Sequence, residues 1–126
     1  MSENSKTVLI VEDDSHISKV YEIQIKREGF NTTIARDGEQ AIEFLKTENF
    51  DLIILDLMIP KKDGFSVLEE IRKNPKFLNI PVLIISNLGQ KADEIRAIEL
   101  GATEYLIKID HSIQEVINKV KSYLEK

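Results

Sequence analysis

The chain has 126 residues, with 17 lysines and arginines against 22 aspartates and glutamates, and a net charge of −5. This length suits one domain with a real core, and the acidic balance argues against non-specific nucleic-acid binding, which needs a basic surface. The absence of cysteine excludes disulfides, thiolate metal sites and thiol catalysis. The longest apolar runs, about five residues, are too short to span a membrane. The N-terminus lacks a signal-peptide core, so we expect a cytoplasmic protein.

Strand-like and helix-like segments alternate along the chain. Apolar, β-branched-rich runs predict strands at Thr7–Val11, Asn31–Ala35, Leu52–Leu55, Val82–Ser86 and Glu104–Ile107. Helical periodicity and boundary signals predict helices over residues 15–28, 39–48, 65–74, 91–100 and 113–124. The second of these strands is the least apolar, which predicts that it lies at an edge of the sheet.

Several residues mark the expected helix boundaries. Ser112 and Glu115 have the spacing of a capping box at the start of the last helix. Asp37 is a similar start signal for the second helix. Gly29 and Gly101 stand where the first and fourth helices should end.

Five β-α units in series predict an α/β fold, with a doubly wound five-stranded parallel sheet and helices on both of its faces. The sequence contains no linker, low-complexity tract or internal repeat. We therefore expect residues 1–126 to form a single domain, with a core of about 6–124 and no output domain.

Polar residues collect where the predicted strands end. In a parallel sheet, the carboxyl ends of all strands face the same edge, where α/β folds place their chemistry. The residues that reach this edge are Glu12, Asp13, Asp14, Asp56, Ser86 and Lys108. Because four carboxylates would repel one another, the pattern predicts a bound cation, and oxygen ligands suit Mg²⁺.

These residue types also suit phosphate chemistry. Asp56 could act as a nucleophile toward phosphorus and form an aspartyl phosphate. Lys108 could bind one phosphate oxygen as a compact positive charge, and Ser86 could donate a hydrogen bond to another. Taken singly, Asp14 could instead cap the following helix, Lys108 could be solvated and Ser86 could be a turn residue. Their coincidence at one edge favours the functional interpretation.

At this point the sequence resembles a known family. Glu12-Asp13-Asp14, the segment from Asp56 to Gly64, Ser86, and Tyr105-Leu106-Ile107-Lys108 are similar to the motifs of the receiver domain of bacterial two-component response regulators. The resemblance covers roughly residues 6–124. It implies the flavodoxin-like (βα)5 receiver fold and a signalling module.

The resemblance implies a role for each matching residue. Asp56 would accept phosphate from a sensor histidine kinase or a phosphotransfer protein. Mg²⁺ would be held by Asp13 or Asp14, by Asp56 and by the main-chain carbonyl of Met58. The module would catalyse only its own phosphorylation and dephosphorylation, and would not be an enzyme with a separate substrate.

Three further positions match the family's phosphate-binding and switching residues. Lys108 would bind the phosphate, and Ser86 and Tyr105 would form the switch pair, with Tyr105 moving inward from an outward rotamer. The surface formed by the fourth predicted helix, the fifth strand and the fifth helix would then bind a downstream effector protein or, in a phosphorylation-dependent homodimer, a second copy. We expect neither nucleic acid nor a membrane as a partner.

Two positions depart from the family pattern. Ile109 stands where proline commonly follows the lysine, often after a cis peptide bond. Because a cis bond before a residue other than proline costs about 2.5–4 kcal/mol, we expect the bond between Lys108 and Ile109 to be trans. Asn87 replaces the usual small residue after the switch serine, where it could crowd the phosphate or add a hydrogen bond.

Two other functions remain open from the sequence. A degenerate receiver would act as a phosphorylation-independent interaction module, for which Ile109 and Asn87 are the argument. An aspartate-nucleophile phosphatase of the haloacid-dehalogenase type would need a general acid two residues after Asp56. Met58 stands there and cannot transfer a proton. Phosphorylation by acetyl phosphate and turnover of p-nitrophenyl phosphate distinguish the three.

Overall fold

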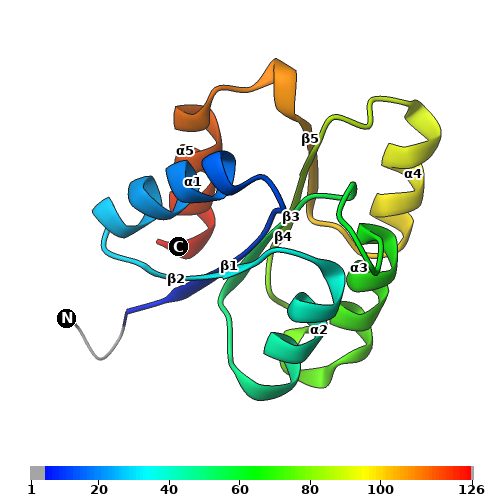
Figure 1. Cartoon of the computed structure of the whole chain (residues 1–126), viewed down its shortest axis with the longest axis horizontal. Helices are drawn as coiled ribbons and strands as arrows, with labels where there is room; N and C mark the ends of the chain where they lie inside the picture. Colours follow the sequence, from blue (N-terminus) through cyan, green and yellow to red (C-terminus); the bar gives the residue numbers. More distant parts are fainter. Residues whose placement is uncertain (1–4, 126) are drawn as a thin grey trace.

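The computed structural model describes residues 5–125, and its centre is one sheet of five parallel strands (Figure 1). Within the sheet the strands follow the order β2-β1-β3-β4-β5. The bounds are β1 Thr7–Val11, β2 Asn31–Ala35, β3 Leu52–Leu55, β4 Val82–Ser86 and β5 Glu104–Ile107. All five agree with the predicted strands, and β2 lies at an edge as expected.

Five α-helices follow the strands in turn. Their bounds are α1 Ser15–Arg27, α2 Gly38–Thr47, α3 Gly64–Lys73, α4 Lys91–Glu99 and α5 Ile113–Leu124, with short 3-10 turns η1 at Pro75–Phe77 and η2 at Lys108–Asp110. The predicted α2 and α3 began one residue late. Asp37 and Asp63 cap these helices, which makes the following glycine the first helical residue.

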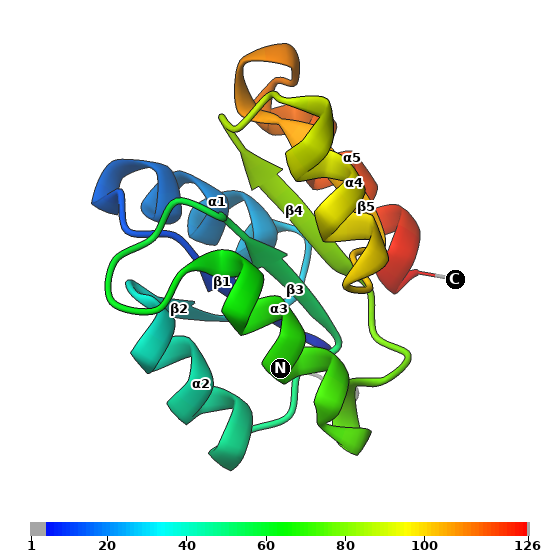
Figure 2. The same ribbon diagram turned by 90° about the vertical axis from the view of Figure 1, so that its right-hand side faces the viewer.

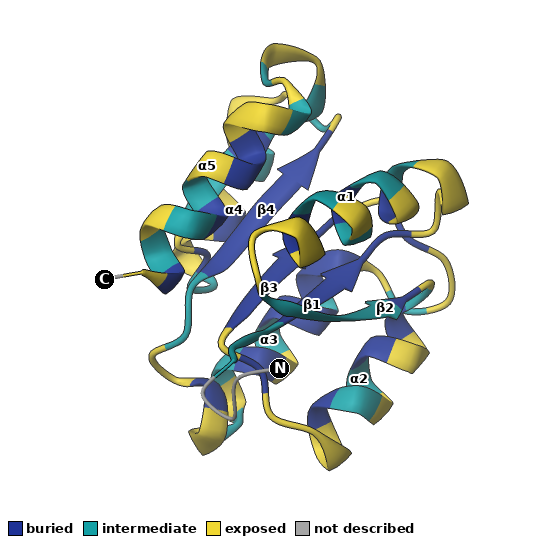
Figure 3. Ribbon diagram, turned by 90° about the vertical axis from the view of Figure 1, so that its left-hand side faces the viewer, coloured by how far each residue is buried: buried dark blue, intermediate teal, exposed yellow. Residues whose placement is uncertain are grey.

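The helices cover both faces of the sheet, which confirms the doubly wound fold. Helices α1 and α5 pack on one face and α2, α3 and α4 on the other, the face seen in Figure 2. Strands β1, β3 and β4 are almost wholly buried, whereas the edge strand β2 is half-buried and each helix is buried on one side only (Figure 3). A continuous apolar strand is what burial on both faces requires.

The predicted boundary signals have the expected geometry. The Ser112 hydroxyl accepts from the Glu115 amide while the Glu115 carboxylate accepts from the Ser112 amide, a complete capping box. Gly29 has φ +94° and Gly101 has φ +108°, a left-handed backbone that suits glycine after a helix. No helix in the described part of the chain is long and apolar enough to cross a membrane.

The strand order creates one switch point at the carboxyl edge of the sheet. The chain passes from β1 outward to β2, and then crosses to β3 on the other side of β1. Open α/β sheets bind ligands at such a switch point, between the two strands whose connections diverge. Here these strands are β1 and β3, and Val11 and Leu55 are paired at their ends.

Candidate functional site

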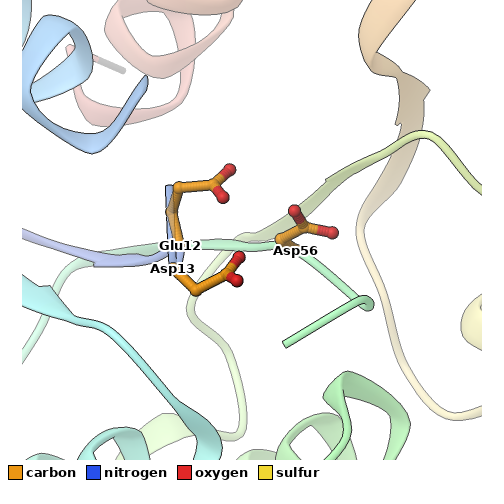
Figure 4. A group of neighbouring side chains, drawn as sticks. All are labelled: Glu12, Asp13 and Asp56. Atoms are coloured by element: carbon orange, nitrogen blue, oxygen red, sulfur yellow. The ribbon is translucent and has the colours of Figure 1, made fainter. Parts of the chain in front are cut away.

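Three carboxylates meet at the carboxyl ends of β1 and β3. Glu12 and Asp13 follow β1, Asp56 follows β3, and one oxygen from each lies within 4.8 Å of the others. Figure 4 shows the three side chains extending from the two strand ends in the same general direction. The pairing of the strands explains the meeting, because the Asp56 amide donates to the Val11 carbonyl (3.0 Å) and so aligns the two ends.

Lys108 joins this group from the end of β5. Its Nζ lies 2.7 Å from Glu12 Oε1 and 2.7 Å from Asp56 Oδ2, and its side chain is mostly buried. Glu12 is 2% exposed and Asp56 5% exposed, so these charge-assisted hydrogen bonds are largely shielded from water. One ammonium therefore serves two of the three carboxylates, which leaves the group with net negative charge.

Burial and ion pairing shift the pKa values of Glu12 and Lys108. Burial raises the pKa of the Glu12 carboxyl; the Lys108 hydrogen bond acts against this, and the charge of Asp56 acts in the same direction as burial. For Lys108, burial alone would lower the pKa, but the hydrogen bonds to Asp56 and Glu12 outweigh it and the pKa is raised. Lys108 is thus held charged, while Glu12 is the member whose ionised form the fold disfavours.

Asp14 is not part of the three-carboxylate group. Its Oδ1 accepts hydrogen bonds from the backbone amides of His16 (2.9 Å) and Ile17 (3.0 Å), so its side chain caps α1. The bond from Ile17 is the main cause that lowers the pKa of Asp14. Of the two roles that the sequence left open for Asp14, the structure shows capping.

Glu12, and not Asp14, is the third carboxylate that lies beside Asp13 and Asp56. The sequence pattern predicts Glu12 at this edge of the sheet. The family resemblance, however, implies only Asp13 or Asp14 as the carboxylate ligand that follows the first strand. The signal was available, because Glu12 is the first residue after β1 just as Asp56 is the first after β3. Glu12 also uses its second oxygen, Oε2, to accept from the Asp14 amide at 3.1 Å.

Met58 contacts Asp56 through its backbone. The Met58 amide donates to Asp56 Oδ1 at 3.0 Å, so this carboxylate has a hydrogen bond on each oxygen, from Met58 and from Lys108. The Met58 side chain is exposed. The carbonyl of Met58 stays a predicted ligand.

Ser86 and Tyr105 meet at one residue, Leu88. The Ser86 hydroxyl is fully buried and accepts from the Leu88 amide at 3.4 Å. The Tyr105 hydroxyl donates to the Leu88 carbonyl at 2.5 Å. Burial is the main cause that raises the pKa of Tyr105. The two predicted switch residues therefore bond to the same residue of the β4–α4 loop, Ser86 to its amide and Tyr105 to its carbonyl.

The segment after Lys108 follows the expected path for a non-proline residue. No peptide bond within residues 5–125 is cis, so the bond from Lys108 to Ile109 is trans as predicted. The chain forms the η2 turn there, and the Ile109 side chain is 85% exposed. Lys108 nevertheless reaches Asp56, which shows that a trans bond is compatible with this contact.

The chain is similar to proteins of one family. The model of the response regulator receiver domain matches residues 8–121. A probable transcriptional regulator, ycf27 of Cyanophora paradoxa, is 35% identical over 126 residues, which are 100% of this chain and 51% of that protein. The chain spans about half the length of the curated relatives it matches.

Solved structures show the same relationship. The receiver domain of the Francisella response regulator 1452 has a TM-score of 0.85 and 34% identity, covering 96% of this chain and 98% of that one. The Mn²⁺-bound form of the response regulator Rcp1 has a TM-score of 0.83 and 32% identity, covering 94% of each chain. Together with the acidic group at the ends of β1 and β3, the match over residues 8–121 shows that the chain belongs to the response regulator receiver domain family.

Proposed function

We propose that this chain is a phosphorylatable switch that accepts a phosphoryl group on Asp56 in a Mg²⁺-dependent reaction. The observation that carries the proposal is the buried contact of Asp56 with Lys108, beside Glu12 and Asp13. This transfer needs a nucleophilic carboxylate, a lysine ammonium that can bind a phosphoryl oxygen, and further anionic oxygens that can hold Mg²⁺. A sensor histidine kinase or a phosphotransfer protein is the proposed donor.

The three carboxylates fit a hard divalent cation. Mg²⁺ prefers oxygen ligands and commonly takes only one or two carboxylates while keeping several waters. We assign Asp13 and Asp56, with the Met58 carbonyl, as direct ligands and Glu12 as the supporting carboxylate. Asp14 is omitted because its side chain caps α1. The Mn²⁺-bound form of Rcp1, 32% identical, supports a cation in a relative.

The residues divide the transfer among them. An oxygen of Asp56 attacks phosphorus, an O–P bond forms, and the bond from phosphorus to the donor's imidazole nitrogen breaks with its electron pair left on nitrogen. A bound Mg²⁺ would supply positive charge against the phosphoryl oxygens. Lys108, already in contact with Asp56, is close enough to bind a phosphoryl oxygen carried by that carboxylate. Because the phosphoryl group stays on Asp56 of the same chain, we propose no separate turnover substrate.

The output surface is proposed on α4, β5 and α5. Helix α4 buries only Ala97 and lacks a side-chain cap at Gln90, so few contacts hold it. Its exposed face carries Ile95 and Ile98, apolar side chains that a partner could cover. The partner would be a downstream effector or a second copy of this chain that prefers the phosphorylated form.

Mass spectrometry after incubation with acetyl phosphate and Mg²⁺ tests the proposal. We expect the parent protein to gain the mass of one phosphoryl group, Asp56→Asn to gain none, and EDTA to abolish the gain. Asp51→Asn is a matched control, because it removes an aspartate charge at the amino ends of the strands, directly before β3. The oxygen of the new side chain can still accept from the Thr7 amide. Equal phosphorylation of Asp56→Asn and the parent would overturn the assignment. An unmodified parent would instead favour a degenerate receiver.

A further inference from the structure

The β3–α3 loop, residues 57–63, has an unusual backbone close to Asp56. Lys61 has φ +70°, and it is the only residue other than glycine with positive φ in the described chain. The Lys62 amide donates to the Pro60 carbonyl at 2.9 Å, which closes a tight turn around Lys61. Such a conformation is strained for a lysine and persists only where surrounding contacts enforce it.

Gly38, the first residue of α2, supplies one of those contacts. Its amide donates to the Pro60 carbonyl at 3.1 Å, the same oxygen that accepts from Lys62. A Cβ on Gly38 would lie 2.0 Å from the Lys62 carbonyl oxygen and 2.6 Å from the Lys62 Cβ. The φ of Gly38 is not left-handed, so close approach, and not backbone freedom, explains a glycine at this position.

Asp37 holds the same loop through its side chain. One carboxylate oxygen caps α2 by accepting from the Gln40 amide at 2.8 Å, and the other lies 3.7 Å from Lys61 Nζ. The start of α2 therefore contacts three successive residues of the loop, Pro60, Lys61 and Lys62. No sequence pattern signals these contacts, because the two segments are more than 20 residues apart.

The far ends of the loop lie at the phosphate acceptor. The Met58 amide donates to Asp56 Oδ1, and the Gly64 amide donates to the Leu57 carbonyl at 3.1 Å. A shift of Pro60 or Lys62 must pass along this short segment to Met58. The position of Met58 relative to Asp56 thus depends on contacts made by α2.

We propose that the Asp37–Gly38 turn is a positioning element for the cation site, and that it keeps the β3–α3 loop in its strained conformation. This inference rests on the proposed function, because it assumes that Asp56 and its surroundings bind Mg²⁺. The turn itself touches none of the three carboxylates of the site. Its effect is transmitted through the loop backbone.

A Mg²⁺ titration followed by backbone NMR, without phosphate donor, tests the inference. Removing residues that orient metal ligands typically weakens metal binding 10–100-fold, so we expect about tenfold weaker binding in Gly38→Ala. In the metal-free protein, the Met58 amide proton should also shift upfield as its bond to Asp56 lengthens. Gly29→Ala is the control. Gly29 is a left-handed residue between α1 and the start of β2, so an alanine there strains the backbone and lowers stability without touching the β3–α3 loop.

A second pair of variants decides the question if Gly38→Ala does not fold. Asp37→Asn keeps the cap but loses the ion pair to Lys61, and a partly exposed pair of this kind predicts about twofold weaker binding. Glu39→Gln removes the same charge from an exposed neighbour that makes no hydrogen bond or ion pair to the loop within the described residues. Equal affinities in these two variants would then overturn the inference.

The outcomes separate this inference from the proposed function. A parent protein that binds no Mg²⁺ contradicts the proposed function. A parent that binds Mg²⁺, with Gly38→Ala changed by less than about twofold or weakened no more than Gly29→Ala, contradicts only the positioning role, since loss of an orienting residue predicts a larger effect.

Discussion

Glu12 connects stability and function at the scale of a single residue. Because burial raises its pKa, the folded chain binds a proton at Glu12 more readily than the unfolded chain does. The stabilising contribution of such a group is complete below its unfolded pKa and is lost as the pH rises through its folded pKa. Above its folded pKa, the ionised Glu12 therefore lowers the stability of the metal-free protein relative to the neutral carboxyl.

We expect Glu12→Gln to melt at or above the temperature of the metal-free parent at pH 7, because the neutral amide avoids burying a charge. The difference should close as the pH falls through the folded pKa of Glu12, since the parent then carries a neutral carboxyl as well. In the presence of Mg²⁺ the order of the two melting temperatures should reverse. A ligand that binds only the folded state stabilises it, and only the parent keeps the Glu12 carboxylate that supports the proposed Mg²⁺ site. Thermal unfolding with EDTA and with Mg²⁺ measures both effects.

Glu43→Gln is the control for Glu12→Gln, because Glu43 is an exposed residue of α2 that pairs with Lys46 on the same helix at 3.6 Å. It should show neither the pH dependence nor the response to Mg²⁺. A Glu12→Gln variant that is less stable than the parent in EDTA at pH 7 would contradict the proposed cost of burying this charge.

The run Glu12-Asp13-Asp14 shows what a sequence can predict about single residues. It correctly brings carboxylates to the end of β1 and predicts their meeting with Asp56, because strand pairing aligns the two ends. The run of three acidic residues does not show at which of them the chain turns from β1 into α1. The turn into α1 begins at once, and the third carboxylate becomes the helix cap.

At the scale of the element, alanine variants of Asp14 and Asp13 should show that helix capping and cation binding belong to different residues. Asp14→Ala should lower the melting temperature, because two amides of the first turn of α1 lose their acceptor. Its Mg²⁺ affinity should stay close to that of the parent. Asp13→Ala should do the opposite, weakening Mg²⁺ binding with little loss of stability. Thermal unfolding and Mg²⁺ titration of both variants check this pair of outcomes.

The pH dependence gives a second check on Asp14. Its pKa is lowered in the folded chain, so its contribution to stability is present above the unfolded pKa and is lost as the pH falls through the folded pKa. The stability gap between the parent and Asp14→Ala should therefore be open at pH 7 and close in acid. Asp14→Asn should retain most of the cap, because an amide oxygen can also accept. A Mg²⁺ affinity lost in Asp14→Ala but kept in Asp13→Ala would reverse the assignment.

The elements differ in how well their contacts can be predicted. The buried strands were predictable to the residue, since β3 and β4 need apolar side chains on both faces. The contacts of Arg72 were not, although they join α3 to η1 and to the loops before β4 and β5: its guanidinium donates to carbonyls of Phe77, Ile80 and Gly101. Such contacts, like those of Gly38, depend on how distant segments pack and leave no periodic signal.

At the scale of the whole molecule, Leu88 is the residue through which, under the proposed function, a charge change at Asp56 would reach α4. Ser86 and Tyr105 hold the amide and the carbonyl of this residue. The bond to Ser86 is long, and the hydroxyl can still donate to a phosphoryl oxygen while it accepts from Leu88. Because Tyr105 already bonds to Leu88 without phosphate, phosphorylation would favour an arrangement that the chain can adopt by itself, a shift of population.

The size of that shift can be bounded. Moving an equilibrium from 1:99 to 99:1 needs about 5.5 kcal/mol of differential interaction, and one hydrogen bond to a charged group supplies about 1.5–3 kcal/mol. Ser86 alone is therefore insufficient. The remainder must come from Lys108, which exchanges a carboxylate for a phosphoryl oxygen, and from ordering of residues 87–90. Without these contributions the population shift is only partial.

Chemical-shift mapping with and without the phosphate mimic beryllofluoride measures the response of the whole molecule. We expect changes at Asp56, along residues 86–90, in α4 and at Tyr105, because α4 is the helix with the fewest buried side chains. Tyr105→Phe should keep the changes at Asp56 but reduce those in α4, since it removes the hydrogen bond to Leu88. Tyr123→Phe is a matched control on α5, where the hydroxyl instead bonds to Glu104. Changes confined to the loops around Asp56, with α4 and Tyr105 silent, would mean that phosphorylation does not reach this surface.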